Sequence, residues 1–233
     1  MRYLWFALLL PAVSPPVAAA QGACADVPKF FAHPPTVGEW AEMTWESKNK
    51  DDPDHMRMGV IKAERREGKQ MYWFQMSMED KGKRTILQML SPWDVNSLRS
   101  PQPAEVVMKM GDQPAMKMSG GLMGKSPASK TDWRDFCAKS TFVGEESVTV
   151  PAGTFKTRHY HSEDGDTWAS MDAPLWHIVK MSTKDGKTMV LSARGMGEKN
   201  EITEQPVDMK EMMANPQAAQ KMKEEMEKNK ASK

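Results

Sequence analysis

Apolar and polar residues alternate along several short stretches of this chain, and this period of two restricts the fold more than any other feature. Near the start, Met56, Met58 and Val60 alternate with Arg57 and Gly59. The pattern returns at Tyr72, Phe74, Met76 and Met78, at Val106, Met108 and Met110, and at Met116 and Met118. Such alternation is typical of antiparallel strands with one face against a core and the other face polar.

Short polar segments bearing glycine or proline separate these stretches and predict hairpin turns. They cover residues 78–84, 110–116, 150–155 and 183–188, and Asp185-Gly186 in the last predicts a two-residue turn. Further strands are expected at 37–46, 85–90, 145–150, 154–161 and 166–170. With about ten strands and no crossover helices, we expect a mainly β fold: a curved antiparallel sheet or incomplete β-barrel with a C-terminal amphipathic helix.

The first twenty residues are predicted to be a signal peptide. Arg2 precedes an apolar run from Tyr3 to Val13 that is too short for a membrane span, and Ala18 and Ala20 fit the small-x-small rule of signal peptidase. We therefore expect a periplasmic or secreted protein. No later segment is apolar enough to predict an integral membrane span.

The end of the chain is predicted to be helical. Ala219, Met222 and Met226 recur at three- and four-residue spacing, which places them on one face of a helix. The expected organisation is a signal peptide at 1–20, an antiparallel β half-barrel domain at 21–206 and a helical tail at 207–233.

The chain has two cysteines, Cys24 and Cys137. In an oxidising compartment two cysteines usually pair, so we predict one disulfide between them. A pair of buried free thiols is the alternative. Cys24 also admits a lipoprotein interpretation, although Gln21 stands where the lipid-attachment pattern has leucine.

Charge and motifs exclude some classes of function. Lys and Arg number 32 and Asp and Glu number 31, so removing Arg2 leaves 31 of each. A balanced charge does not predict a nucleic-acid partner, which requires a basic surface. No hydrolase elbow, zinc-protease motif or phosphate loop occurs. We expect no enzyme activity and no cofactor.

Methionine is unusually frequent, with 22 residues in 233. Thioethers are soft ligands that suit Cu(I), so the Met-x-Met pairs admit a methionine-rich copper-binding protein. Methionine also suits an adaptable lining for apolar ligands, and it fills ordinary cores. We favour the lining. The predicted ligand-binding residues are Met56, Met58, Tyr72, Phe74, Met76, Met78, Met108, Met110, Met116 and Met118.

Two further features have competing interpretations. His159, His161 and His177 suggest a zinc site, but the sequence shows no acid or cysteine that completes the set, so scattered surface histidines are favoured. The segment Ser91–Pro103 carries Trp93 and reads either as an apolar lid or as a loop pinned by Trp93 in the core.

The stretch Gly144–Met181 resembles a module of uncharacterised secreted bacterial proteins: a Gly-Glu-led strand, the turn VPAGTF, a second strand and a W-x-S-x-x-x-P segment. Such modules are similar to the outer-membrane lipoprotein carrier and receptor fold, the LolA/LolB-like half-barrel. This resemblance implies an incomplete antiparallel barrel around an apolar cavity covered by helices.

The resemblance supplies no catalytic or lipid-contact residue. It implies a non-catalytic binding protein for a lipid or a lipoprotein acyl chain at the cell envelope, with envelope lipoproteins as candidate partners. A Cu(I)-binding periplasmic protein and a purely structural envelope protein are the alternatives.

Overall fold

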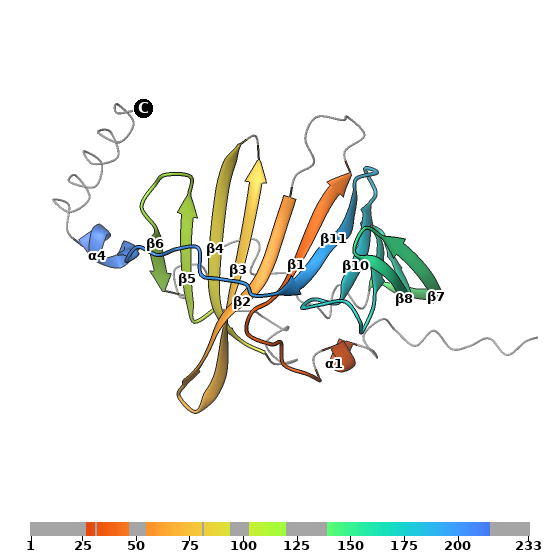
Figure 1. Cartoon of the computed structure of the whole chain (residues 1–233), viewed down its shortest axis with the longest axis horizontal. Helices are drawn as coiled ribbons and strands as arrows, with labels where there is room; N and C mark the ends of the chain where they lie inside the picture. The colour runs from red at the N-terminus through yellow and green to blue at the C-terminus, as the bar shows by residue number, and fades with distance from the viewer. Residues whose placement is uncertain are drawn as a thin grey trace, which may run out of the picture.

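A computed structural model of the chain describes residues 27–30, 32–46, 55–80, 82–93, 103–119 and 139–214. Its strands form one large, curved and unclosed sheet in the order β12-β6-β5-β4-β3-β2-β1-β11-β10-β9-β8-β7 (Figure 1). The strands are β1 (Glu39–Glu46), β2 (His55–Arg66), β3 (Lys69–Asp80), β4 (Lys83–Pro92), β5 (Glu105–Met110), β6 (Met116–Ser119), β7 (Thr141–Val150), β8 (Gly153–Ser162), β9 (Gly165–Ala169), β10 (Ile178–Thr183), β11 (Thr188–Met196) and β12 (Val207–Asp208). Neighbouring strands are antiparallel, except that β12 pairs with β6 in parallel. The predicted mainly β, curved and open architecture is confirmed.

Two hairpin turns show how local backbone conformation fixes the strand pairing. The turn between β2 and β3 is Glu67-Gly68, with φ of 50° and 77° at the two residues, which is the geometry of a type I′ turn. The turn between β10 and β11 differs from the prediction. The N–H of Thr183 donates to the carbonyl of Lys187 at 2.9 Å, so three residues form the loop. Gly186, at φ 80°, is the left-handed residue that such a three-residue loop requires.

The main core lies on one face of the sheet, which we call the inner face. Val60, Val179 and Leu191 are completely buried there, and Phe74 and Phe155 are nearly so. The sheet curls around this face, because β7 contacts β10 and β11 although β8 and β9 lie between them in the sheet order. The N–H of Ala152 at the β7–β8 turn donates to the carbonyl of Leu191 at 3.2 Å.

The opposite, outer face is crossed by an extended segment, residues 197–206, which we call the strap. It leaves β11, runs over β2 to β5 and joins β12 at the far edge (Figure 1). Ile202 of the strap packs with Ile86, Val107 and Ala115 in a second, smaller core, against which Trp73 rests. The strap therefore covers the polar face of the sheet, where the sequence pattern predicted solvent.

Buried amides hold the strap to the sheet. Gln75 of β3, 1% exposed, donates to the carboxylates of Glu198 and Glu201 at 3.0 and 3.1 Å and to the carbonyl of Lys199 at 3.1 Å. Its amide oxygen accepts the N–H of Glu201 at 3.0 Å. Gln88 of β4 donates to Gln75 at 2.9 Å and to Asn200 at 2.6 Å. Each of these hydrogen bonds satisfies a polar group that burial alone would destabilise.

An ion pair anchors the first part of the strap. Arg57 of β2 donates from two guanidinium nitrogens to one oxygen of Glu198, at 3.0 and 2.9 Å. The Glu198 side chain is only 4% exposed. It fits because residue 59 is glycine: a Cβ there would stand 2.3 Å from the Glu198 Cγ. The Arg57 guanidinium also stacks on Trp40, 3.7 Å from the ring centroid.

Two short helices complete the described chain, α1 (Val27–Phe30) and α4 (Met209–Ala214). Helix α4 lies within the range 207–233 predicted to be a helical tail, but Val207 and Asp208 just before it belong to the sheet. The predicted amphipathic face at 219–226, the signal peptide, Cys24, Cys137 and residues 94–102 lie outside the described residues. The corresponding predictions therefore stay predictions.

Candidate functional site

Strand pairing places all ten residues predicted to bind a ligand on the inner face. Directly opposed residues of antiparallel strands share a face, so the register defines cross-strand rows. The central row runs Met58, Met76, Leu87, Met108 and Met116, from β2 to β6. A second row runs Met56, Met78, Thr85 and Met110. A third runs Val60, Phe74, Met89, Val106 and Met118. Tyr72 continues the same face of β3.

We call part of this surface the methionine face, defined by Met56, Met58, Met76, Met78, Leu87, Met89, Met108, Met110, Met116 and Met118. Leu87 and Met89 of β4 join the two groups that the sequence predicted separately. The sequence does not single them out, because β4 shows its alternation less clearly than the neighbouring strands.

Burial changes across the methionine face. Met58 belongs to the main core, and Met56 and Met76 pack against it. Met78 and Met110, both in the second row, are 39% and 40% exposed. Met108, Met116 and Met118 are half-buried. A surface of flexible thioethers that is apolar but not fully packed can adapt to an apolar partner.

Aromatic rings lie where the methionine face meets the main core. Trp93, just after β4, and Trp176, in the loop of residues 170–177, each lie within 5.9 Å of the Phe74 ring centroid. Their own centroids are 5.6 Å apart. The contacts fit the interpretation of Trp93 as a residue pinned in the core.

The loop of residues 170–177 folds over the inner face in an uncommon conformation. Leu175 and His177, on either side of Trp176, have φ of 55° and 60°. Residues other than glycine rarely adopt this region, so packing must hold them there. Leu175 is 3% exposed, and the His177 ring stacks on Phe30 at 5.3 Å while Nε2 lies 2.7 Å from the Phe30 carbonyl oxygen.

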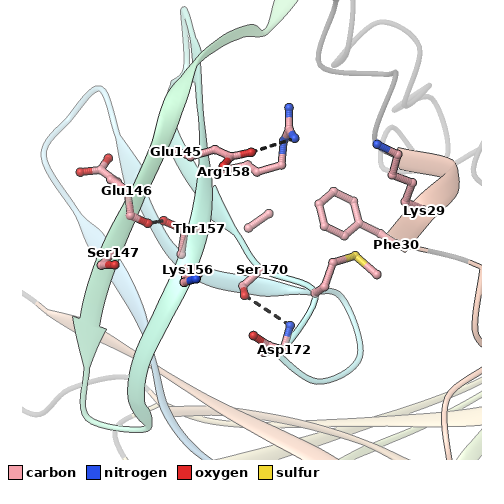
Figure 2. A pocket seen from close by; sticks show the side chains of 12 residues that line it. Lys29, Phe30, Glu145, Glu146, Ser147, Lys156, Thr157, Arg158, Ser170 and Asp172 are labelled. Atoms are coloured by element: carbon pink, nitrogen blue, oxygen red, sulfur yellow. Dashed lines mark hydrogen bonds and ion pairs between the residues drawn. The ribbon is translucent and has the colours of Figure 1, made fainter.

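A separate cavity of about 730 Å³ lies beside α1, away from the methionine face (Figure 2). Its lining carries both positively and negatively charged side chains. Arg158 and Glu145 form an ion pair of 3.1 Å, and the backbone N–H of Asp172 donates to Ser170 Oγ at 3.3 Å. Phe30 supplies an apolar wall.

The three histidines of the zinc alternative do not come together, although two of them share an acid that the sequence analysis missed. His159 Nε2 and His161 Nδ1 lie 2.8 and 2.9 Å from the same oxygen of Asp166, and His159 Nδ1 lies 3.3 Å from Glu146. His177 is instead hydrogen-bonded through Nε2 to the carbonyl oxygen of Phe30. Within the described ranges, no group of three or more His, Cys, Asp and Glu side chains could hold a metal ion. Asp166 follows His161 by five residues, a hairpin spacing that could have revealed the contact.

Asp166 predicts a pH-dependent contribution to stability. Burial alone would raise the pKa of Asp166, but hydrogen bonds from His159 and His161 outweigh it and lower the pKa below its ordinary value. A lowered carboxyl pKa stabilises the fold above the unfolded pKa, about 3.9, and this contribution is lost as pH falls through the folded pKa. We expect Asp166→Asn to cost about 1 kcal/mol at pH 7. Urea unfolding at pH 7 and pH 3 should show the difference shrinking at the lower pH. An equal cost at both values would contradict the assignment.

No family model and no curated protein matches the chain. Among solved structures, it is similar to a protein described as exported, with a YmcC-like fold, from Bacteroides fragilis, at 11% identity over 70% of this chain and 97% of that one, with a TM-score of 0.32. A protein described as a lipoprotein, from Parabacteroides distasonis, matches at 13% identity over 71% and 98%, with a TM-score of 0.34.

A third similar structure is MucB in complex with MucA(peri), at 12% identity over 76% of this chain and 56% of that chain, with a TM-score of 0.39. Scores at this level do not assign a function. No helix in the described part of the chain has both the length and the apolar character needed to cross a membrane.

Proposed function

We propose that this chain is an exported, non-catalytic binding protein that holds an apolar ligand, such as the acyl chain of a lipid or lipoprotein, on its methionine face. The observation that carries the proposal is the central row, which is apolar over five consecutive strands and incompletely buried. Four interstrand spacings give this row a length of about 19 Å, the scale of an extended long acyl chain.

The two faces of the sheet support this assignment of the binding surface. Along β3 to β5 the outer face is tied to the strap by hydrogen bonds and ion pairs, such as Lys109 with Glu204 at 2.6 Å. The inner face of the same strands carries flexible side chains. Export to the periplasm or the cell exterior is proposed on the predicted signal peptide, and envelope lipoproteins are the proposed partners.

A charge introduced within the central row should weaken binding. We expect the protein to bind the fluorescent fatty acid cis-parinaric acid. Met108→Asp should weaken this binding at least about tenfold, because the new carboxylate must either lose its hydrating water or keep the acyl chain away from the row. Met196→Asp is the matched control, since Met196 is 62% exposed on β11 and lies off the methionine face. Met110 is a poorer site for this test because at 40% exposure a carboxylate there stays hydrated.

Two outcomes would count against the proposal. One is a wild-type protein that does not bind the probe. The other is equal weakening by Met108→Asp and Met196→Asp while circular dichroism shows both variants folded.

A further inference from the structure

Four methionines form a rectangle on β2 and β3. Met56 lies directly opposite Met78, and Met58 lies directly opposite Met76. Within each strand the two methionines are two residues apart and share the inner face. Opposed Cβ atoms in such pairs are about 5 Å apart, and residues two apart along a strand are separated by about 7 Å. The sequence shows two Met-x-Met pairs, and only the register shows that they face each other.

The rectangle has a buried side and an open side. Met58 is 8% exposed within the main core, and Met56 and Met76 pack against that core. Met78 is 39% exposed, which gives solvent access to one corner. Across the neighbouring strands, Met56 faces Met43 of β1, and Met76 faces Leu87 of β4. Met78 faces Thr85 of β4, so the surroundings are apolar except for one hydroxyl, and the thioethers are the soft ligands available.

Thioether sulfur is a soft ligand that suits Cu(I), whereas Mg²⁺ and other hard ions prefer oxygen ligands. A methionine side chain has three rotatable bonds. Four such chains, rooted at the corners of a rectangle of about 5 by 7 Å, can bring their sulfurs to one point. We propose that Met56, Met58, Met76 and Met78 form a binding site for a soft monovalent cation, Cu(I), with Ag(I) as its redox-stable analogue. The site shares Met58 and Met76 with the central row, but cation binding does not require that an acyl chain binds there.

The methionines of β5 and β6 provide an internal comparison. Met108 lies opposite Met116, but Met110 lies opposite Thr85 and Met118 lies opposite Val106. Met110 and Met118 therefore lie in the two outer rows, one on each side of the row that contains the Met108–Met116 pair. This second set offers one opposed pair of sulfurs where β2 and β3 offer two adjacent pairs. It has the same residue type and number without the same geometry.

The test uses full-length protein labelled with ¹³C at the methionine methyl groups and titrated with Ag(I). One equivalent should shift the methyl signals of Met56, Met58, Met76 and Met78, each assigned through a single Met→Leu variant. Native mass spectrometry should show one bound ion. The variant with Met56, Met58, Met76 and Met78 all replaced by leucine should lose stoichiometric Ag(I) binding. The matched variant with Met108, Met110, Met116 and Met118 replaced should keep it.

Leucine conserves volume, so both quadruple variants should remain folded. Thermal unfolding checks this, and if the β2–β3 quadruple variant is unfolded, the single-variant methyl shifts decide the matter on the native protein. Absence of a bound ion, shifts spread over most of the 22 methionines, or equal loss of Ag(I) in both variants would overturn the proposal. Competition with a Cu(I) chelator then tests whether the same four methyl groups respond to Cu(I).

Discussion

Glu198→Ala is expected to lower the free energy of unfolding by about 3 kcal/mol, because it leaves Arg57 and Gln75 without their shared carboxylate under the strap. The Glu198 side chain is 4% exposed, whereas Arg57 is 30% exposed and keeps its stacking on Trp40. This residual solvation of Arg57 places the cost near the lower end for breaking a buried ion pair. Urea unfolding followed by circular dichroism measures it.

Gly59→Val tests the same contact from the sheet side. A Cβ at residue 59 would lie 2.3 Å from the Cγ and 3.0 Å from the Cβ of Glu198, so the whole side chain must move. We expect a similar loss of about 3 kcal/mol. Gly144→Val in β7 is the control, since a Cβ there meets nothing within 4 Å.

The double variant sharpens the test. Glu198→Ala removes the Cγ and Cδ that a Cβ at residue 59 would meet most closely, so the combined loss should be smaller than the sum of the two single losses. Additive losses, or a Glu198→Ala protein as stable as the wild type, would show that the strap does not depend on this contact.

Trp176→Ala should cost about 3 kcal/mol, because it removes the ring that contacts both Phe74 and Trp93. Without it, the packing that holds Leu175 and His177 at positive φ is weakened. The residual space lies beside Phe74, where the methionine face meets the main core, so cis-parinaric acid should bind the variant at least as well as it binds the wild type.

Two controls separate packing from general damage to the loop. Trp176→Phe keeps an aromatic ring and should recover more than half of the loss. Met171→Ala, in the same loop but 50% exposed, should change stability by less than about 0.5 kcal/mol. A Trp176→Ala protein with wild-type stability would mean that the aromatic contacts make no net contribution to the free energy of unfolding.

The sequence predicts the strands well because their period of two is a local property. The stretches around Met56, Phe74 and Met108 alternate clearly, and each became a strand with the predicted residues on the inner face. The β10–β11 turn was predicted one residue too short, since Asp185-Gly186 fits two turn types and only the hydrogen bond from Thr183 distinguishes them.

Features that depend on long-range contacts could not be predicted. Gln75 and Gln88 read as solvent-facing polar positions, yet both are buried because the strap, more than a hundred residues later, covers them. The Met56–Met78 pairing needs the register of β2 against β3, which a bulge near Val60 shifts. The sequence shows the Met-x-Met pairs but not which strands pair. It therefore cannot decide whether the methionines of different strands lie close enough to bind copper.

The pairing of β1 with β11 imposes an order on how this chain folds. Strands β1 to β6 and strands β7 to β11 can each form by successive neighbours, but β1 must meet a strand about 150 residues away. Contacts of such separation carry a large loop-closure cost and tend to be slow. When the chain emerges N-terminus first, one edge of β1 therefore stays unpaired until β11 has emerged. The strap, which begins directly after β11, can close over the outer face only once that edge is paired.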